Sequence, residues 1–235
     1  MSLLESIDAY EKPERAKQLI TEHPSLNIAG PSGAGKGTMV QYLVQSREYA
    51  PVVSDTTRDP RPFGNGLEVN GVHYWFIDEQ TAMAKLADGA YIEVKAVHGD
   101  TLYGTSIASY ERVLSSGQTP ILEIDVQGMK DLMEEVPGFE SILLLPPDFA
   151  TWEHRIDGRG DMTQEQKVRR FTTAVMEYGV VFENDRFHPV VNTEVIDTAE
   201  IIRSGEYKNP EYREYALKVA GELRSATQAF LDSNK

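Results

Sequence analysis

The chain contains no cysteine, which excludes disulfide bridges, thiolate metal sites and thiol catalysis. It also lacks any apolar run near the roughly 18 residues needed to cross a bilayer. Basic residues are in the minority, with 23 Lys and Arg against 37 Asp and Glu, and the formal net charge is -14. Such a chain repels nucleic acids and anionic membranes at long range, so we expect neither as a partner. A small phosphorylated ligand remains possible, provided that a local cluster of basic side chains holds it.

Other classes of function lack their signals too. The five histidines show no metal-ligand spacing, and no G-x-S-x-G nucleophile motif occurs. The polar, acidic start MSLLESIDAYEKPERAKQ does not fit a signal peptide, so we expect a cytoplasmic protein. With 235 residues, 40% of them hydrophobic, the chain is long enough for one core domain with an appended lobe.

Short apolar runs alternate with helical patterns along most of the chain, which predicts an α/β fold with a parallel sheet and crossover helices. The predicted strands are Leu26–Ala29, Pro51–Ser54, Tyr91–Val97, Thr119–Asp125, Ser141–Leu145 and Pro189–Asn192. The predicted helices are Gly37–Gln45, Ser106–Ser115, Gly128–Glu135 and Phe149–Asp157. The aliphatic runs ILEID and SILLL are typical of central strands that are buried on both faces.

Two regions interrupt this alternation. Residues 56–77 are rich in Pro, Gly and Arg, and Asn70-Gly71 between alternating apolar residues predicts a hairpin. This region, about 55–97, reads as a small β-rich lobe inserted into a core made of residues 25–54 and 98–205. The Gly-rich, charged segment 158–166 lies between two helical patterns and suits a lid.

Both ends of the chain read as helical additions to the core. We expect a helical extension over residues 1–24, with a helix at Lys12–Glu22, and a C-terminal helix within 206–235. Asn209 and Pro210 are good N-cap and first-turn residues for that last helix. Its apolar stripe at helical spacing predicts packing, either on the core or on a second copy.

The segment GPSGAGKGT follows the first predicted strand and leads into a helix. Its glycines let main-chain N–H groups surround phosphates, the helix N-terminus adds positive potential, and Lys36 reaches the β- and γ-phosphates. The expected ATP-phosphate ligands are Gly30, Ser32, Gly33, Ala34, Gly35, Lys36, Gly37 and Thr38. Position 37 usually carries a Ser or Thr that binds Mg²⁺. With Gly37 there, we expect Mg²⁺ to be held mostly by phosphate oxygens and water.

A second basic motif, SDTTRDPRP, places Arg58 and Arg61 three residues apart in a stiff, Pro-limited segment. Two guanidinium forks can clamp one phosphate dianion. An Arg pair at this spacing is by itself more often a solvated surface feature. The context decides between the two interpretations.

Over residues 25–205 the sequence resembles the guanylate kinase family, a group of P-loop nucleoside-monophosphate kinases. Seven segments occur in the family's order: GPSGAGKGT, SDTTRDPRP, NGVHYWF, YIEVKAVHGDTLYGTS, ILEIDVQG, LLLPPDFATWEHRIDGRG and PVVN. The resemblance implies a P-loop kinase core, a lobe that binds the nucleoside monophosphate (NMP) and a short lid. It also implies direct in-line transfer of the γ-phosphoryl group of ATP to GMP with Mg²⁺.

The resemblance also assigns roles residue by residue. The acceptor phosphate falls to Arg58, Arg61, Tyr74 and Tyr103, and guanine recognition to Ser54, Glu93 and Thr105. The chemistry agrees, since one carboxylate can accept from both N1–H and N2–H of guanine while hydroxyls donate to O6. Adenine has no such donor pair and would leave Glu93 poorly matched.

The remaining predicted residues surround the transferring phosphoryl group. Arg155, Arg159 and Arg170 flank the lid, and the resemblance places them on the phosphates with Lys36 and Arg58 as catalytic residues. Arg169 competes with Arg170, but the spacing from Gly160 favours Arg170. Asp125 closes the run ILEID and is expected to bind GMP and Mg²⁺ through water; the alternative is a helix N-cap. The family's first aspartate in this motif is Glu123 here.

Two stretches depart from the family pattern. The link PFGNGLEVNG after Arg61 is longer than usual, and HGDTLYG is one residue longer. Two alternatives therefore stay open beside the kinase for GMP. One is a kinase for another monophosphate, such as dGMP or a modified pyrimidine nucleotide, and the other is a non-catalytic domain that binds phosphoproteins. Monomer and homodimer are both compatible with the sequence.

Overall fold

The computed structural model describes residues 2–64, 66–97, 99, 101–158 and 162–234. Contacts between residues divide the chain into two units. The first unit comprises Met1–Ser25, Tyr49–Leu122 and Lys130–Phe139, and the second comprises Leu26–Glu48, Glu123–Met129 and Glu140–Lys235. Parallel strands and flanking helices confirm the predicted α/β class.

In the second unit, the apolar runs form three parallel strands in the order β11-β10-β1. They are β1 (Leu26–Ala29), β10 (Ser141–Leu145) and β11 (Phe187–Val191). β10 lies between the other two and is buried along its whole length, as its continuous aliphatic sequence predicts. β1 and β10 match their predicted ranges. β11 begins earlier than predicted because Phe187 and His188 pair with Ser141 and Ile142.

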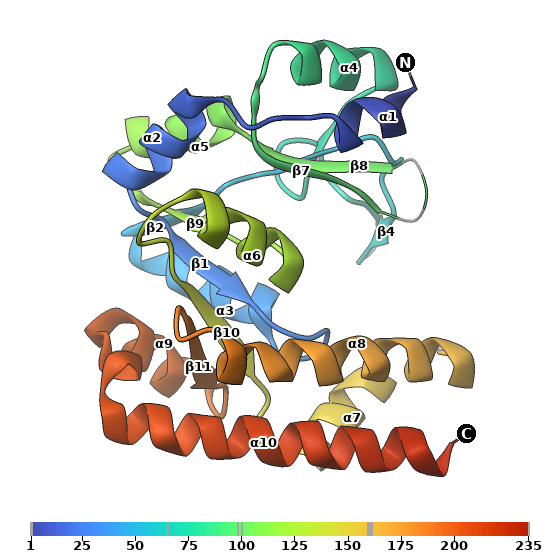
Figure 1. The fold of residues 1–235 in the computed structure, drawn as a ribbon, viewed down its shortest axis with the longest axis vertical. Coiled ribbons are helices and arrows are strands. Elements are labelled where there is room, and N and C mark those ends of the chain that lie inside the picture. Colours follow the sequence, from blue (N-terminus) through green and yellow to red (C-terminus); the bar gives the residue numbers. More distant parts are fainter. Residues whose placement is uncertain (1, 65, 98, 100, 159–161, 235) are drawn as a thin grey trace. The chain divides into compact units, whose positions relative to one another are not determined.

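Five α-helices lie wholly within this unit over its described residues. They are α3 (Lys36–Leu43), α7 (Phe149–Asp157), α8 (Gln164–Glu183), α9 (Val195–Ser204) and α10 (Pro210–Ser233). Short 3₁₀ turns cover Val44–Ser46 and Glu206–Lys208. Asn209 caps α10, as predicted, by accepting a hydrogen bond from the N–H of Glu211 at 2.9 Å. α8 and α10 run antiparallel, side by side (Figure 1), and α10 buries its apolar stripe within its own unit.

Aromatic side chains join three of these helices. Trp152 of α7 stacks on Phe171 of α8 with ring centroids 4.5 Å apart, and Phe171 meets Phe230 of α10 at 4.8 Å. Trp152 and Phe171 are fully buried. The C-terminal helix is therefore part of the core that supports α7. Within the described part of the chain, no helix has both the length and the apolar character needed to cross a membrane.

The first unit carries a mixed sheet in the order β6-β3-β8-β7. Its strands are β3 (Asp55–Thr56), β6 (Trp75–Phe76), β7 (Tyr91–Val97) and β8 (Thr101–Ser106). The same unit holds the parallel pair β2 (Tyr49–Pro51) and β9 (Thr119–Leu122) and the antiparallel pair β4 (Pro62–Phe63) and β5 (Gly66–Leu67). β7 matches its predicted range. β8, which the sequence analysis did not identify, pairs antiparallel with β7.

Two predictions in this unit are wrong. Of the expected strand Pro51–Ser54, only Pro51 belongs to a strand, at the end of β2. Residues 52–54 form a break between β2, which pairs with β9, and β3, which pairs with β6 and β8. The turn at Asn70-Gly71 does form, with Gly71 at φ +75°, but it does not close a hairpin. It leads into β6, which runs parallel to β3, while the antiparallel pair is β4–β5, which ends three residues before Asn70.

The helices complete the first unit. They include α1 (Leu3–Asp8), α2 (Glu14–Glu22), α4 (Glu79–Ala87) and α5 (Ile107–Ser115), while α6 (Val126–Glu135) starts among residues of the second unit. α1 was not predicted, although Ser2 and Glu5 form a capping box at its start. Its Leu3 and Ile7 pack on a cluster with Ala82, Leu86, Tyr91 and Leu102. The N-terminal extension is thus attached to the β7–β8 sheet.

Candidate functional site

The loop between β1 and α3 is shaped by glycines. Gly30, Gly33 and Gly35 have positive φ angles of 140°, 88° and 95°. A Cβ at Gly30 would lie 2.4 Å from the main-chain oxygen of Leu144, and one at Gly35 would lie 2.4 Å from the Asn192 side chain. Only glycine fits such positions, and the resulting wrap suits a loop whose N–H groups surround an anion.

Two buried side chains from distant parts of the unit hold this loop. The indole N–H of Trp152 donates to the carbonyl of Ser32 at 2.7 Å. The amide of Asn192 donates to the carbonyl of Ala34 at 2.8 Å. Nothing in the sequence indicates which carbonyl the N–H of Trp152 reaches. Both bonds fix loop carbonyls, so the loop is formed before any ligand arrives.

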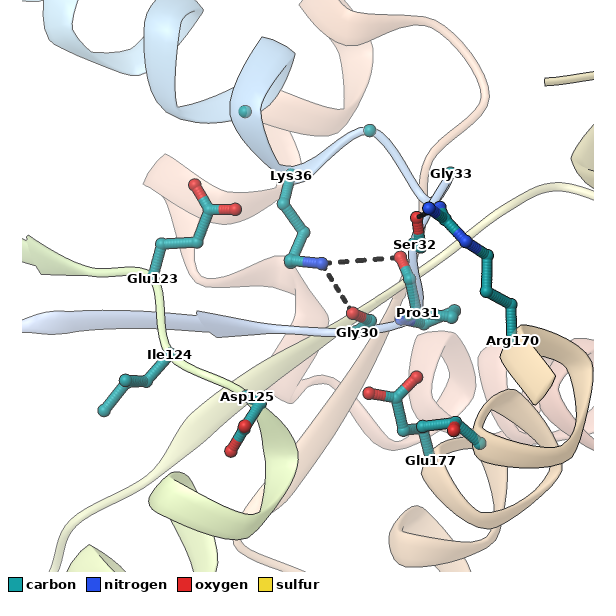
Figure 2. Close-up of a pocket in the computed structure, with 13 residues that line it drawn as sticks. Gly30, Pro31, Ser32, Gly33, Lys36, Glu123, Ile124, Asp125, Arg170 and Glu177 are labelled. Atoms are coloured by element: carbon teal, nitrogen blue, oxygen red, sulfur yellow. Dashed lines mark hydrogen bonds between the residues drawn. The ribbon is translucent and has the colours of Figure 1, made fainter. Parts of the chain in front are cut away.

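Lys36 is folded back onto this loop. Its Nζ donates to the carbonyl of Gly30 at 2.6 Å and to that of Pro31 at 3.4 Å (Figure 2). From α8, Arg170 Nη1 donates to Ser32 Oγ at 2.9 Å. Arg169 pairs instead with Glu165, and both side chains are largely exposed. The structure therefore brings Arg170 rather than Arg169 to the loop.

A cavity of about 380 Å³ lies beside the loop within the second unit. Of the predicted residues, those lining it are Gly30, Ser32, Gly33, Gly35, Lys36, Gly37, Asp125 and Arg170. Ala34 and Thr38 belong to the same loop and helix but are not among the lining residues. Arg155 does not line it either, because α7 turns Trp152 and Ile156 toward the loop at Gly33. Arg159 lies outside the described residues, together with residues 160–161 of the predicted lid.

Three carboxylates line the same cavity: Glu123, Asp125 and Glu177. Glu177 was missed, as was Thr173. Together with Arg170 they follow the spacing i, i+3, i+7, which places all three on one face of α8. That periodicity could have identified them once Arg170 was chosen.

Asp125 both faces the cavity and caps a helix. It lines the cavity, and its Oδ1 also accepts the N–H of Gly128 at 2.9 Å in the first turn of α6. The strand expected to reach Asp125 ends at Leu122, so residues 123–125 leave the strand to line the cavity. The last three residues of that predicted strand were therefore wrong, while the placement of Asp125 beside the loop was right.

The side chains beside the loop fit a magnesium ion that arrives with a polyphosphate. Mg²⁺ keeps several waters and binds through one or two carboxylates together with substrate phosphates. Glu123 and Asp125 supply such carboxylates, and Gly37 supplies no hydroxyl. Over the described ranges, no group of three or more His, Asp or Glu side chains could hold a metal by itself.

In the first unit, the side chain of Arg58 is held by several partners at once. Its Nε donates to the hydroxyl of Tyr103 at 2.8 Å, and its Nη1 donates to the carbonyl of Asp59 at 2.9 Å. Its guanidinium carbon lies 4.9 Å from the ring centroid of Tyr74, whose ring meets that of Tyr103 edge-on at 5.6 Å. Three of the four predicted phosphate ligands therefore form one cluster.

Glu68 completes this cluster and was not among the predicted residues. Its two carboxylate oxygens accept from Nη1 and Nη2 of Arg58, the latter at 2.9 Å. Hydrogen bonding to Arg58 lowers the pKa of Glu68 to about 2, and the same bond raises the pKa of Arg58. Arg61 joins through its main chain, whose N–H donates to Glu68 at 2.8 Å, while its side chain is exposed.

The three residues predicted for guanine form a chain of polar contacts in the same unit. The β7–β8 register places Glu93 opposite Thr105. Thr105 Oγ1 donates to Glu93 Oε1 at 2.8 Å and lies 3.3 Å from Ser54 Oγ. Glu93 is 9% exposed, and burial raises the pKa of its carboxyl. Such a carboxyl is poised to gain from two donors on a ligand.

β8 sets the spacing between the two clusters. Tyr103 and Thr105 lie on the same face of the strand, two residues or about 7 Å apart. One end of this face is basic and hydroxyl-rich, while the other carries a buried carboxyl. The arrangement can hold an anion and a hydrogen-bonding ring of one small molecule. It can do so despite the longer loops before Tyr74 and Tyr103.

Comparisons with known proteins agree with this chemistry. The family model described as "Guanylate kinase" matches residues 23–232. A curated protein named "Guanylate kinase" from Leifsonia xyli is 36% identical over 195 residues, covering 82% of this chain and 72% of that protein. One of the same name from Bifidobacterium longum is 37% identical, covering 73% and 87%. The solved structure of guanylate kinase from Anaplasma phagocytophilum matches with a TM-score of 0.57 at 24% identity, covering 80% of this chain and 88% of that one.

Proposed function

Because the chain belongs to the guanylate kinase family, we propose that it transfers the γ-phosphoryl group of ATP to GMP, forming ADP and GDP. In this reaction a phosphate oxygen of GMP bonds to the γ-phosphorus while the bond from that phosphorus to the β-phosphate oxygen breaks. No covalent enzyme intermediate is needed, so the protein acts by positioning the groups and neutralising their charge.

The chain of Ser54, Thr105 and Glu93 carries the assignment of guanine. A buried carboxyl whose neighbours are hydroxyls favours a ring that offers two adjacent N–H donors and one acceptor. Cytosine and uracil lack this pattern, and adenine leaves the carboxyl without its donors. Buried polar groups that a wrong ligand leaves unpaired can discriminate by as much as ~10⁴-fold.

The phosphate loop serves ATP. We assign the β- and γ-phosphates to the loop N–H groups and to Lys36, whose bonds to two loop carbonyls would be exchanged for phosphate oxygens. Arg170 is assigned to the transferring group, since it already contacts Ser32 of the loop. Glu123 and Asp125 would hold Mg²⁺ with its waters, and Mg²⁺ when bound neutralises phosphate charge. Arg155 and Arg159 keep their predicted roles on the resemblance alone.

The test is ADP formation with Mg-ATP and GMP, dGMP, AMP, UMP or dTMP, with Lys36→Ala as the control. Turnover with GMP that Lys36→Ala abolishes is the expected result. Turnover only with another monophosphate would contradict the assignment of Glu93 to guanine. Absence of turnover by the wild type with all five acceptors would contradict the kinase activity itself.

Two finer points complete the proposal. We expect the enzyme to act in the cytoplasm, in line with its acidic composition. It would act as a monomer or as a homodimer. The packing of the α10 apolar stripe within its own unit favours the monomer. Light scattering on the purified protein separates these two states.

A further inference from the structure

The longer link after Arg61 forms a small hairpin whose base returns the chain to the arginines. β4 and β5 pair antiparallel, with Pro62 opposite Leu67. The pairing continues one step further, since the N–H of Glu68 donates to the carbonyl of Arg61 at 2.9 Å. Arg61 in turn donates its own N–H to the Glu68 carboxylate. The β4–β5 pairing therefore keeps Glu68 next to Arg58.

The carboxylate of Glu68 uses only one edge of the Arg58 guanidinium. It accepts from Nη1 and Nη2, which form the end of the fork. The side edge of the fork, formed by Nε and Nη2, points to Tyr103 through Nε. A guanidinium has five N–H donors in a rigid plane, so an anion can bind at each edge without displacing the other. One Nη2 donor remains on the side edge.

Tyr103 shares this edge in a way that suits a phosphate. Its hydroxyl oxygen accepts from Arg58 Nε, so its own proton is directed elsewhere and can be donated to an acceptor. Phosphate oxygens are acceptors only. The Tyr74 ring supports the guanidinium from its face, and the Arg58 side chain is 10% exposed. Arg58 is therefore fixed by side chains on its end, its side and its face.

We infer that Glu68 is a positioning residue for the acceptor phosphate, which locks Arg58 so that its remaining Nη2 donor and the Tyr103 hydroxyl meet GMP. This inference rests on the proposed function. An unrestrained arginine loses rotamer freedom when it binds a ligand, and here Glu68 removes that freedom before GMP arrives. Because the carboxylate is ionised far below neutral pH, it acts the same way at every working pH.

The test compares Glu68→Gln with the wild type and with the control Glu79→Gln, which removes an exposed carboxylate from α4 of the same unit. We expect KM for GMP to rise about tenfold in Glu68→Gln, as for loss of a charged hydrogen-bond partner. KM for ATP should not change, and kcat should change less than KM for GMP. Glu68→Asp, which keeps the charge, should recover part of the loss.

Two further measurements separate positioning from a general structural role. Guanosine, which lacks the phosphate, should inhibit the wild type and Glu68→Gln with the same inhibition constant. In an Arg58→Ala background, Glu68→Gln should have no further effect on GMP binding measured by calorimetry, because Glu68 acts through Arg58. Equal weakening of guanosine and GMP would overturn the inference.

Tighter rather than weaker GMP binding by Glu68→Gln would overturn the inference as well. If Glu68 occupied the place of the phosphate, Glu68→Gln would bind GMP more tightly than the wild type. Unchanged GMP binding would also refute it. A wild type that binds GMP but never phosphorylates it would contradict the proposed reaction. In that case, GMP binding by the wild type and by Glu68→Gln would still test the role of Glu68.

Discussion

The two regions that we assign to phosphates hold their basic side chains in different ways. Lys36 of the second unit donates to neutral main-chain carbonyls of its own loop. Arg58 of the first unit is held by a full carboxylate, a tyrosine hydroxyl and a carbonyl. A carbonyl exchanges easily for a phosphate oxygen, whereas a bidentate carboxylate does not. Lys36 is therefore expected to exchange its partners when a phosphate binds, whereas Arg58 is expected to keep its position before and after GMP binds.

The largest expected effect on activity is at Lys36, in the phosphate loop. Lys36→Ala should lower kcat by roughly a thousandfold, the scale for loss of one group that stabilises developing charge. GMP binding, measured by calorimetry without ATP, should stay within about twofold because no GMP ligand is touched. A comparable loss of GMP affinity would show that the two phosphate regions are not independent.

A smaller loss of activity is expected from a change at Glu93, in the part of the acceptor site assigned to guanine. Glu93→Gln should lower kcat/KM for GMP about a hundredfold, because the amide offers a donor where guanine needs an acceptor. The value of kcat/KM for AMP should fall by a smaller factor than that for GMP. Equal losses for AMP and GMP in the coupled assay would argue against the role of Glu93 in recognising guanine.

The same variant makes a prediction about stability. The folded-state pKa of Glu93 is raised by burial, so its contribution to stability is present at low pH and is lost as the pH rises through that pKa. Glu93→Gln should therefore unfold at a higher temperature than the wild type at pH 7 without ligand. The difference should vanish near pH 4. Melting curves across this range check the sign.

The shape of the phosphate loop gives a fourth, more modest effect. Gly35→Ala places a Cβ 2.4 Å from the Asn192 amide at φ +95°, so it should destabilise the fold by about 2 kcal/mol. Gly37→Ala is the matched control in the same segment, since its Cβ would meet nothing within 4 Å. Similar melting temperatures for the two variants would contradict the bracing of the loop by Asn192.

The smallest effect is expected at the departure from the usual motif. Gly37→Ser introduces the hydroxyl that most phosphate loops carry, into open space at the start of α3. Helix propensity should raise stability by about 0.5 kcal/mol. If phosphates and water hold most of the Mg²⁺ coordination, kcat should change by less than about threefold. A large gain in kcat would show that Gly37 limits the enzyme.

Local signals made parts of the fold predictable. β1, β7, β10 and α7 match their predicted ranges because continuous apolar runs or helical periodicity define them within a few residues of chain. β8 was missed because TLYGTS is too polar to read as a strand until β7 is beside it. The strand predicted at Pro51–Ser54 failed because its residues pass between two different pairings.

The candidate site also divides into residues that local sequence signals identified and contacts that they did not. The sequence by itself determined the phosphate loop, because its ligands are main-chain groups of consecutive residues and its glycines are visible in order. It also named Arg58, Glu93 and Thr105, through the resemblance to a family. Only the tertiary structure decided that Glu68 meets Arg58, that Trp152 and Asn192 brace the loop, and that Glu177 lines its cavity. The contacts of Trp152 and Asn192 join residues more than 100 positions apart, and Glu68 reaches Arg58 only because the β4–β5 pair turns the chain back. Strand register and helix packing set these contacts rather than any local preference.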